Sequence, residues 1–165
     1  MTVQVHIRHS DNNDIAAIKA LYAQPSCYAN TLQLPHPSLE KWIARLTGPH
    51  EHFYSLVAEV DGHIVGQLGM EVFSSPRRKH VANIGMAVDE RSRGQKIGAA
   101  LVEQAIVLAN DWLAIKRIEL EVYTDNQVAI SLYKRFGFEI EGTAKAYAFR
   151  GGRYVDAHLM AKVIN

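Results

Sequence analysis

The stretch that says most about the fold is Ile84-Gly85-Met86-Ala87-Val88-Asp89-Glu90-Arg91-Ser92-Arg93-Gly94-Gln95-Lys96-Ile97-Gly98-Ala99-Ala100-Leu101. Its apolar beginning predicts a strand, its basic and glycine-containing middle predicts a turn, and its end predicts the start of a helix. The start of a helix exposes backbone N–H groups that lack acceptors, beside the positive end of the helix dipole. This arrangement is typical of a phosphate-binding site.

Two common phosphate-binding motifs do not fit this stretch. The dinucleotide fingerprint G-x-G-x-x-G and the nucleotide-binding loop G-x-x-x-x-G-K-[ST] both differ in spacing from Arg93-Gly94-Gln95-Lys96-Ile97-Gly98. The segment instead resembles the acetyl-CoA loop [QR]-x-x-G-x-[GA] of the GCN5-related N-acetyltransferases, with Arg93 first and Gly98 last. Lys96 replaces the usual middle glycine. We expect Lys96 to adopt a helical conformation with negative φ, which needs no glycine, and to hold its cation near a phosphate.

Length and composition favour one globular domain. The chain has 165 residues, of which 48% are hydrophobic and 21% are charged, and no linker or repeat divides it, so we expect a single domain over residues 3–163. A net charge of +1 gives no electrostatic basis for nucleic-acid binding, and the run Pro76-Arg77-Arg78-Lys79-His80 is interpreted as a solvated loop. The N-terminal segment lacks an apolar signal core, no apolar run reaches membrane-spanning length, and the single Cys27 excludes an internal disulfide. We therefore expect a cytoplasmic protein that binds neither nucleic acid nor a membrane.

Hydrophobic periodicity along the chain predicts alternating strands and helices. Strands are expected around Val3–Ile7, at Phe53–Val60 and His63–Phe73 joined by the turn Asp61-Gly62, around Gly85, at Ile118–Val122, and in a closing hairpin of Phe138–Tyr147 and Tyr154–Val163. Helices are expected at Ile15–Tyr22 after Asp11, at Leu39–Leu46 after Ser38, at Ile97–Trp112, and from Asn126 to Phe136 with Gly137 as C-cap, whereas Pro25–Pro37 is expected to be irregular. The order β-α-α-β-β-β-α-β-α-β-β predicts an α+β (α/β) fold in which helices flank a mixed central sheet.

A longer motif lies in the second half of the chain. Residues 126–138, Asn126-Gln127-Val128-Ala129-Ile130-Ser131-Leu132-Tyr133-Lys134-Arg135-Phe136-Gly137-Phe138, resemble the N-x-x-A-x-x-[LV]-Y-x-x-x-G-F signature of the same acetyltransferase (GNAT) family. The order of elements also resembles that of the family, so the resemblance covers the chain from about Val3 to Val163. It implies acetyl-CoA as co-substrate, with Asn126 facing its pantetheine arm and Tyr133 pointing at its sulfur. It also implies pyrophosphate binding by Arg93, Gly94, Gln95, Lys96, Ile97, Gly98 and Ala99.

Acetyl transfer to an amine has chemical requirements that can be compared with the residues. The reaction needs a neutral amine, hydrogen-bond donors for the developing oxyanion, and a proton for the departing thiolate. Gly85 within an apolar strand suggests a bulge or a close backbone approach, which would free the N–H of Met86, Ala87 or Val88 for the oxyanion and the pantetheine; the alternative is a glycine fitted under a neighbouring side chain. Tyr133 is the candidate acid, because a phenol with a pKa of ~10 is protonated at neutral pH, and core packing is the alternative.

No residue is singled out as the base. Glu71, His80, Glu119 and Glu121 lie on or near the central strands, but charged strand residues more often simply face solvent, and Asn83 cannot serve. A peptide α-amine with a pKa of ~8 needs less help in losing its proton than a lysine side chain at ~10.4, so the absence of a conspicuous base favours α-amines.

Two other kinds of site are not supported by the sequence. Cys27 has no neighbouring histidine motif and is interpreted as a small buried hydrophobe. His50 and His52 are not accompanied by a second cluster with metal-ligand spacing, so no metal cofactor is expected.

A narrower resemblance concerns the acceptor. Asn30–Ser38 and Glu139–Tyr147, followed by Tyr154–Ala157, resemble the bacterial branch of the family that acetylates free L-amino acids, which is itself similar to phosphinothricin acetyltransferases. This resemblance implies direct attack, in a ternary complex, by the α-amino group of a small amino acid with an apolar side chain. The candidate substrate residues are Asn30, Thr31, Gln33, Pro35 and Tyr147, for which a plain structural loop is the alternative.

Two other functions stay open at this point. One is acetylation of a protein N-terminus, an amino-sugar or a drug amine by the same fold. The other is a non-catalytic CoA-binding regulatory module. A homodimer is compatible with so small a domain.

Overall fold

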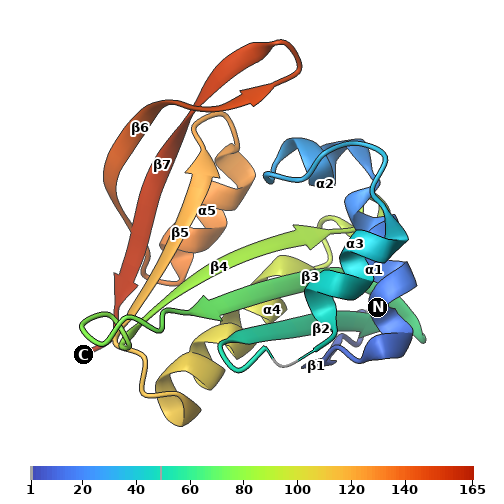
Figure 1. Ribbon diagram of the computed structural model, residues 1–165, viewed down its shortest axis with the longest axis horizontal. Helices are drawn as coiled ribbons and strands as arrows, with labels where there is room; N and C mark the ends of the chain where they lie inside the picture. Colours follow the sequence, from blue (N-terminus) through green and yellow to red (C-terminus); the bar gives the residue numbers. More distant parts are fainter. Residues whose placement is uncertain (1, 49) are drawn as a thin grey trace.

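A seven-stranded mixed sheet forms the centre of the computed structural model, which describes residues 2–48 and 50–165 (Figure 1). The strand order is β1-β2-β3-β4-β5-β7-β6, and every neighbouring pair is antiparallel except β4 with β5. The strands are β1 (His6–His9), β2 (Phe53–Val60), β3 (His63–Val72), β4 (Val81–Val88), β5 (Arg117–Tyr123), β6 (Glu139–Arg150) and β7 (Arg153–Val163). The α-helices are α1 (Ile15–Tyr22), α2 (Pro25–Ala29), α3 (Leu39–Leu46), α4 (Ile97–Val107) and α5 (Gln127–Arg135). The predicted α+β fold with a mixed central sheet is confirmed.

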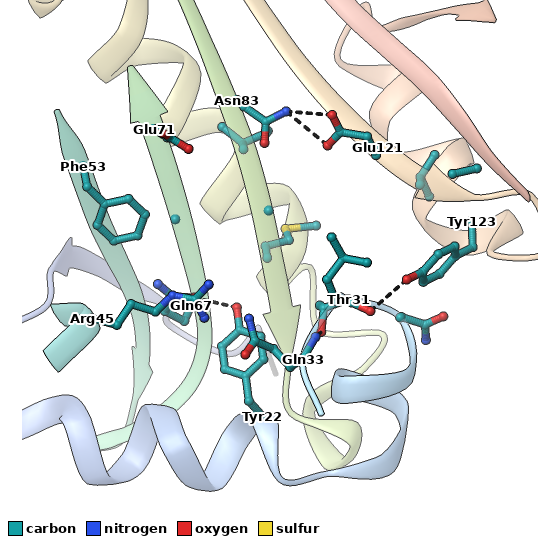
Figure 2. Close-up of a pocket in the computed structure, with 18 of the residues that line it drawn as sticks. Tyr22, Thr31, Gln33, Arg45, Phe53, Gln67, Glu71, Asn83, Glu121 and Tyr123 are labelled. Carbon is teal, nitrogen blue, oxygen red and sulfur yellow. Dashed lines mark hydrogen bonds between the residues drawn. The ribbon is translucent and has the colours of Figure 1, made fainter. Parts of the chain in front are cut away.

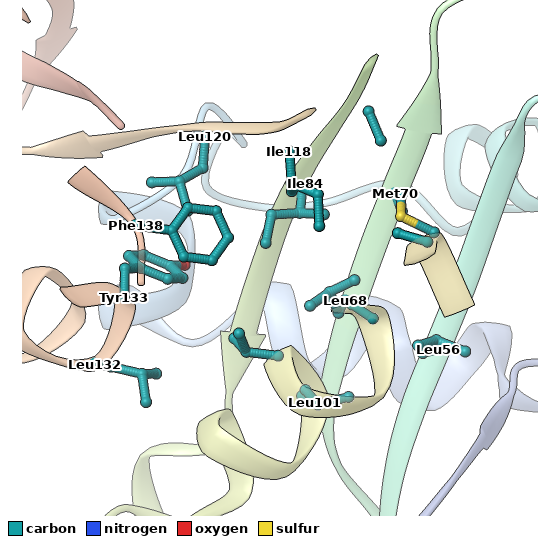
Figure 3. Packing of buried hydrophobic residues seen from close by; sticks show 14 of the residues in the cluster. Leu56, Leu68, Met70, Ile84, Leu101, Ile118, Leu120, Leu132, Tyr133 and Phe138 are labelled. Atoms are coloured by element: carbon teal, nitrogen blue, oxygen red, sulfur yellow. The ribbon is translucent and has the colours of Figure 1, made fainter. Parts of the chain in front are cut away.

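Helices cover both faces of the sheet. On one face, Ile18 of α1, Cys27 of α2 and Trp42 of α3 pack against Val57 and Ala87 of the sheet. On the other face, α4 and α5 pack against the larger apolar cluster, which contains Leu68, Leu101, Ile118, Leu120, Leu132, Tyr133 and Phe138 (Figure 3). The two faces therefore have separate cores, and a ligand that contacts both must pass through the sheet.

Several local signals in the sequence correspond to the geometry that they predict. Asp61 and Gly62 both have positive φ, 50° and 79°, as the short turn between β2 and β3 requires. The Ser38 side chain accepts a hydrogen bond from the Lys41 N–H at the start of α3. Gly137 ends α5 with a φ of 89°.

Three boundaries differ from the expectations. The segment from Pro25 to Pro37 is not irregular throughout, because Pro25 begins α2 at a position where its missing N–H costs no helical hydrogen bond. The first strand begins at His6 rather than Val3. The helix expected at Ile97–Trp112 is α-helical to Val107 and continues as a π-helix over Leu108–Trp112. None of the helices in the described ranges is both long and apolar enough to cross a lipid bilayer.

Candidate active site

The centre of the sheet contains a gap between β4 and β5. These parallel strands pair only where residues 81–83 face residues 117–119. β4 stays paired with β3 as far as Val88, and β5 stays paired with β7 as far as Tyr123. Beyond Asn83 the two strands diverge, so this part of β4 has a strand neighbour on one side only (Figure 1).

The hydrogen bonds between β3 and β4 determine which backbone groups of β4 face the gap. Phe73 N donates to Val81 O at 3.0 Å, and Asp89 N donates to Val65 O at 2.8 Å. Bonded and non-bonded pairs alternate along an antiparallel ladder. The odd-numbered residues of β4 therefore bond to β3, and the even-numbered ones direct their N–H and C=O groups toward the gap.

This alternation separates the three strand residues that were candidates for binding the thioester and pantetheine. The N–H groups of Met86 and Val88 face the gap and are free of strand pairing. The N–H of Ala87 is bonded to β3, so Ala87 is not available as a backbone donor. The predicted bulge at Gly85 is wrong, because the register between β3 and β4 is uninterrupted from Val88 to Ala82. The free donors arise instead from the divergence of β5.

Gly85 has an open side rather than a packed one. A Cβ built on it would meet no atom within 4 Å, so the alternative of a glycine fitted under a neighbouring side chain is also wrong. Gly85 is exposed and forms part of a cavity wall. A close approach of a ligand to this backbone remains a prediction.

The loop between β4 and α4 presents a series of backbone donors. No N–H from Arg93 to Ala99 donates to any residue that the structure describes, and the next N–H, that of Ala100, donates to Lys96 O at 3.1 Å. These free donors lie at the N-terminus of an eleven-residue helix, with the cations of Arg93 and Lys96 on the same loop. The free N–H groups, the positive end of the α4 dipole and the two cations together suit the binding of a pyrophosphate group.

Lys96 contradicts one sequence-based expectation. Its φ is 62° and its ψ is 25°, so it has the left-handed conformation rather than the negative φ predicted for it. The chain reverses direction at this residue to enter α4, and a glycine would adopt that backbone without steric cost. A residue with a Cβ is less stable there by about 1–2 kcal/mol.

Gly98, the last residue of the motif, lies in a closely packed position. A Cβ on Gly98 would lie 3.1 Å from Leu132 Cδ2 and 3.3 Å from Met86 Cε. The first turn of α4 therefore approaches α5 and β4 closely, and a larger residue at this position would push them apart.

Asn126, the N-cap of α5, and Tyr133 within α5 are predicted to contact the coenzyme, and both also have structural roles. Tyr133 is buried and packs edge-on against Phe138, with ring centroids 5.7 Å apart (Figure 3). Burial raises the pKa of Tyr133 to about 12, so the phenol is protonated at neutral pH. The Asn126 side-chain oxygen accepts a hydrogen bond from Ala129 N at 3.3 Å and caps α5. Their contacts with the coenzyme remain predictions.

A cavity of about 290 Å³ opens beside the gap, on the face covered by α1, α2 and α3 (Figure 2). Of the predicted substrate residues, Asn30, Thr31, Gln33 and Tyr147 line it. Pro35 does not: it is exposed and lies outside the lining, because the chain runs into solvent after Gln33. The segment of residues 30–33, which forms the roof of the cavity, is fixed to β5 by the Tyr123 hydroxyl, which donates to Thr31 O at 2.9 Å.

Two of the candidate bases lie in this cavity. Glu71 of β3 and Glu121 of β5 both line it, and Asn83 Nδ2 donates to both carboxylate oxygens of Glu121 at 3.1 Å (Figure 2). Glu119 is paired with Arg78 and Arg117 instead. His80 lies in the loop before β4 and is not part of the lining.

Four polar residues that line the cavity were not candidates from the sequence: Tyr22, Arg45, Gln67 and Tyr123. The Tyr22 hydroxyl donates to Gln67 Oε1 at 2.6 Å, and Gln67 Nε2 donates to Ser55 Oγ at 3.0 Å, so the buried amide has a fixed orientation. Arg45 of α3 lines the same end of the cavity. Gln67 could have been found from the sequence, because it is a polar residue within an otherwise largely apolar strand. Tyr22 and Arg45 had none, because their positions follow from how α1 and α3 cross the sheet.

A hydrogen-bond network connects the cavity roof with the coenzyme loop. Arg93 donates to Ser26 Oγ at 2.7 Å, and Ser26 donates to Glu90 Oε1 from both its N–H and its hydroxyl. The Glu90 N–H donates to Gln24 Oε1 at 2.9 Å. The start of α2, and with it the segment that roofs the cavity, is therefore held against the loop that precedes α4.

The remaining histidine and cysteine candidates have structural surroundings. Cys27 is buried, and its Sγ donates to Val88 O at 3.4 Å. His50 packs edge-on against Phe53. Within residues 2–48 and 50–165, no three His, Cys, Asp or Glu side chains are grouped closely enough to hold a metal ion.

Comparison with known proteins places this geometry among characterised folds. A sequence model described as the acetyltransferase (GNAT) family matches residues 13–138. The chain is 47% identical over 160 residues to the L-amino acid N-acetyltransferase AaaT of Escherichia coli (strain K12), an alignment that covers 97% of this chain and 98% of that protein. It is 35% identical over 120 residues to a putative [ribosomal protein bS18]-alanine N-acetyltransferase of Bacillus subtilis (strain 168), covering 73% and 74% of the two chains. A solved acetyltransferase of the GNAT family from Streptococcus pneumoniae is 25% identical and superposes with a TM-score of 0.84 over 98% of this chain and 100% of that one.

Proposed function

The chain belongs to the acetyltransferase (GNAT) family and is an acetyl-CoA-dependent N-acetyltransferase, and from this premise we propose that its acceptor is the α-amino group of a free L-amino acid with an apolar side chain. The observation that carries the proposal is the 47% identity, along nearly the whole of both chains, to a protein named as an L-amino acid N-acetyltransferase. Sequence similarity of this extent includes the segments that line the cavity.

The cavity supports a small acceptor. Its volume of about 290 Å³ is at the lower end of the range of ligand pockets, which suits one amino acid better than a larger amine. Trp42, Phe53, Ile84 and Val122 contribute apolar wall, and the segment at Thr31 closes the roof. An apolar side chain gains free energy from leaving water for such a wall.

Coenzyme binding is assigned to the loop and to β4. The coenzyme supplies an acetyl group as a reactive thioester. The free N–H groups from Arg93 to Ala99 bind its pyrophosphate. The N–H groups of Met86 and Val88, which face the gap, bind the pantetheine amides and stabilise the oxyanion that develops during attack.

Proton transfer is assigned to two residues on opposite faces of the sheet. Glu121 lies in the acceptor cavity where β4 and β5 diverge, and it removes a proton from the acceptor amine directly or through water. The Asn83 amide holds its carboxylate in place. Tyr133, on the coenzyme face, donates its proton to the departing thiolate, for which a phenol protonated at neutral pH is suited.

A protein N-terminus is the second candidate acceptor, and the 35% identity to a putative ribosomal-protein-alanine acetyltransferase favours it. A peptide acceptor needs a channel that leads out of the cavity. The hydrogen bond from Tyr123 to Thr31 O ties the segment after α2 to β5 across this side of the cavity and leaves less room there for a peptide chain, which supports a free amino acid.

The test is release of free thiol from acetyl-CoA with a panel of the twenty L-amino acids, N-terminal peptides and amino-sugars. We expect release with apolar amino acids and little with the peptides. Release with peptides alone would replace the proposed acceptor by a protein N-terminus. Binding of acetyl-CoA without release for any amine would indicate a non-catalytic module instead.

A further inference from the structure

One cation that lines the acceptor cavity has no acidic partner among the described residues. Arg45, in the last turn of α3, lines the cavity beside Tyr22 and Gln67, with its guanidinium 5.2 Å from the centre of the Trp42 ring (Figure 2). It makes no ion pair and no side-chain hydrogen bond with any residue in the described ranges. A guanidinium presents five N–H donors in a planar fork that matches a carboxylate.

The opposite end of the cavity is acidic. Glu71 and Glu121 line it there, near Asn83 (Figure 2). In Figure 2 Arg45 lies with Gln67 at one end of the view and the two carboxylates lie at the other end, and the open backbone of Gly85 lines the same cavity. An acceptor held in this cavity therefore meets a cation at one end and carboxylates at the other.

That distribution of charge matches a zwitterion in one orientation. A free amino acid carries its ammonium and carboxylate on one carbon, so its carboxylate can face Arg45 while its amine faces the gap and the acidic end. In a peptide N-terminus the corresponding group is a neutral amide, which cannot form a charged pair with a guanidinium.

We propose that Arg45 binds the α-carboxylate of the acceptor and thereby selects free amino acids over amines that lack a carboxylate beside the amine. This inference rests on the proposed acceptor and adds the residue that recognises it. Arg45 is exposed, and its guanidinium contacts the Trp42 ring by a cation–π interaction, which limits the rotation of the side chain at the cavity wall.

The experiment compares each acid with its own amide. L-Leucine, L-methionine and L-phenylalanine are assayed beside L-leucinamide, L-methioninamide and L-phenylalaninamide in wild type, Arg45→Gln, Arg45→Lys and Arg77→Gln. Arg77 is the matched control, because it is exposed on the loop between β3 and β4 and lies outside the cavity. Acetyl-CoA binding by each variant verifies that it is folded.

We expect Arg45→Gln to raise KM for the free acids by roughly 10- to 100-fold and to change kcat/KM for the amides by less than about threefold. Arg45→Lys keeps the charge but loses the fork, so its KM should fall between those of wild type and Arg45→Gln. Arg77→Gln should match wild type.

Three results would overturn the assignment of Arg45. Wild type would use acids and amides equally, Arg45→Gln would leave the preference for the acid unchanged, or it would lower turnover of acid and amide by the same factor. The proposed function fails separately, if wild type acetylates none of the free amino acids.

Discussion

The left-handed backbone of Lys96 leads to a prediction in which stability and coenzyme affinity change in opposite directions. Lys96→Gly removes the steric cost of about 1–2 kcal/mol that a Cβ incurs at a φ of 62°. Glycine in turn loses about 0.5–1 kcal/mol more conformational entropy on folding. The side chain is exposed and makes no ion pair with a described residue, so its removal sacrifices little packing. The expected net gain in the free energy of unfolding is about 0–1.5 kcal/mol, with a midpoint of about 0.75 kcal/mol.

The comparison that isolates the backbone is Lys96→Gly against Lys96→Ala, because both lose the ammonium group and only alanine keeps a Cβ. In a chain of this length, 1 kcal/mol corresponds to a shift in Tm of roughly 2–4 °C. Thermal unfolding without coenzyme should therefore give Lys96→Gly a Tm higher than that of Lys96→Ala by about 1–4 °C. A glycine variant no more stable than the alanine variant would refute the argument from strain.

The contribution of the Lys96 ammonium group is tested separately, by the affinity for acetyl-CoA. Both variants lose a cation from the loop that precedes α4, so both should bind acetyl-CoA roughly 3- to 10-fold more weakly than wild type in titration calorimetry. The difference from wild type should shrink at high salt, because the side chain is solvent-exposed. Unchanged affinity in both would remove Lys96 from the pyrophosphate site.

Three further predictions concern catalysis, packing and pH. Tyr133→Phe should lower kcat by roughly 10²- to 10⁴-fold and leave the Kd for acetyl-CoA near the wild-type value, and undiminished turnover would remove its role as the acid. Gly98→Leu should lower the free energy of unfolding by about 1–3 kcal/mol, measured in urea, because a Cβ already lies 3.1 Å from Leu132 Cδ2 and 3.3 Å from Met86 Cε and a longer side chain has no space between them; an unchanged urea midpoint would show that the helices adjust freely. Asp14→Asn should cost about 1–3 kcal/mol at neutral pH, since Arg8 donates to both oxygens of Asp14 and holds the pKa of that carboxyl below its usual value. Because the pKa of Asp14 is lower in the folded than in the unfolded protein, its ionised form stabilises the fold at pH values above the unfolded pKa, and this stabilisation is lost as pH falls through the folded pKa. The stabilities of wild type and Asp14→Asn should therefore converge below pH ~4, and a constant difference there would contradict the assignment.

Local signals predicted those parts of the fold that depend on neighbouring residues. The Asp61-Gly62 turn, the Ser38 cap and the glycine at the end of α5 each follow from backbone geometry within a few residues. The motif at Asn126–Phe138 identified the family correctly. α2 was missed because a proline that begins a helix looks, in the sequence, like one that ends it.

The candidate site could be predicted only where it is built from one segment. The donors from Arg93 to Ala99 lie on consecutive residues, so their pattern is visible along the chain. The cavity brings together Arg45, Glu71 and Glu121 from α3, β3 and β5, and nothing local indicates that they meet. The conformation of Lys96 was predicted wrongly because the direction in which the chain enters α4 depends on where β4 and α4 are packed.

The short pairing between β4 and β5 has a consequence for how the protein opens. It joins β1–β4 to β5–β7 through three residue pairs, so the backbone hydrogen bonds of the sheet form two blocks that can fluctuate separately. The amides of Met86 and Val88 lie in the middle of the sheet yet should exchange with deuterium as quickly as those of an edge strand. A coenzyme bound across the gap would slow exchange in both blocks together, and the two would then unfold as one cooperative unit.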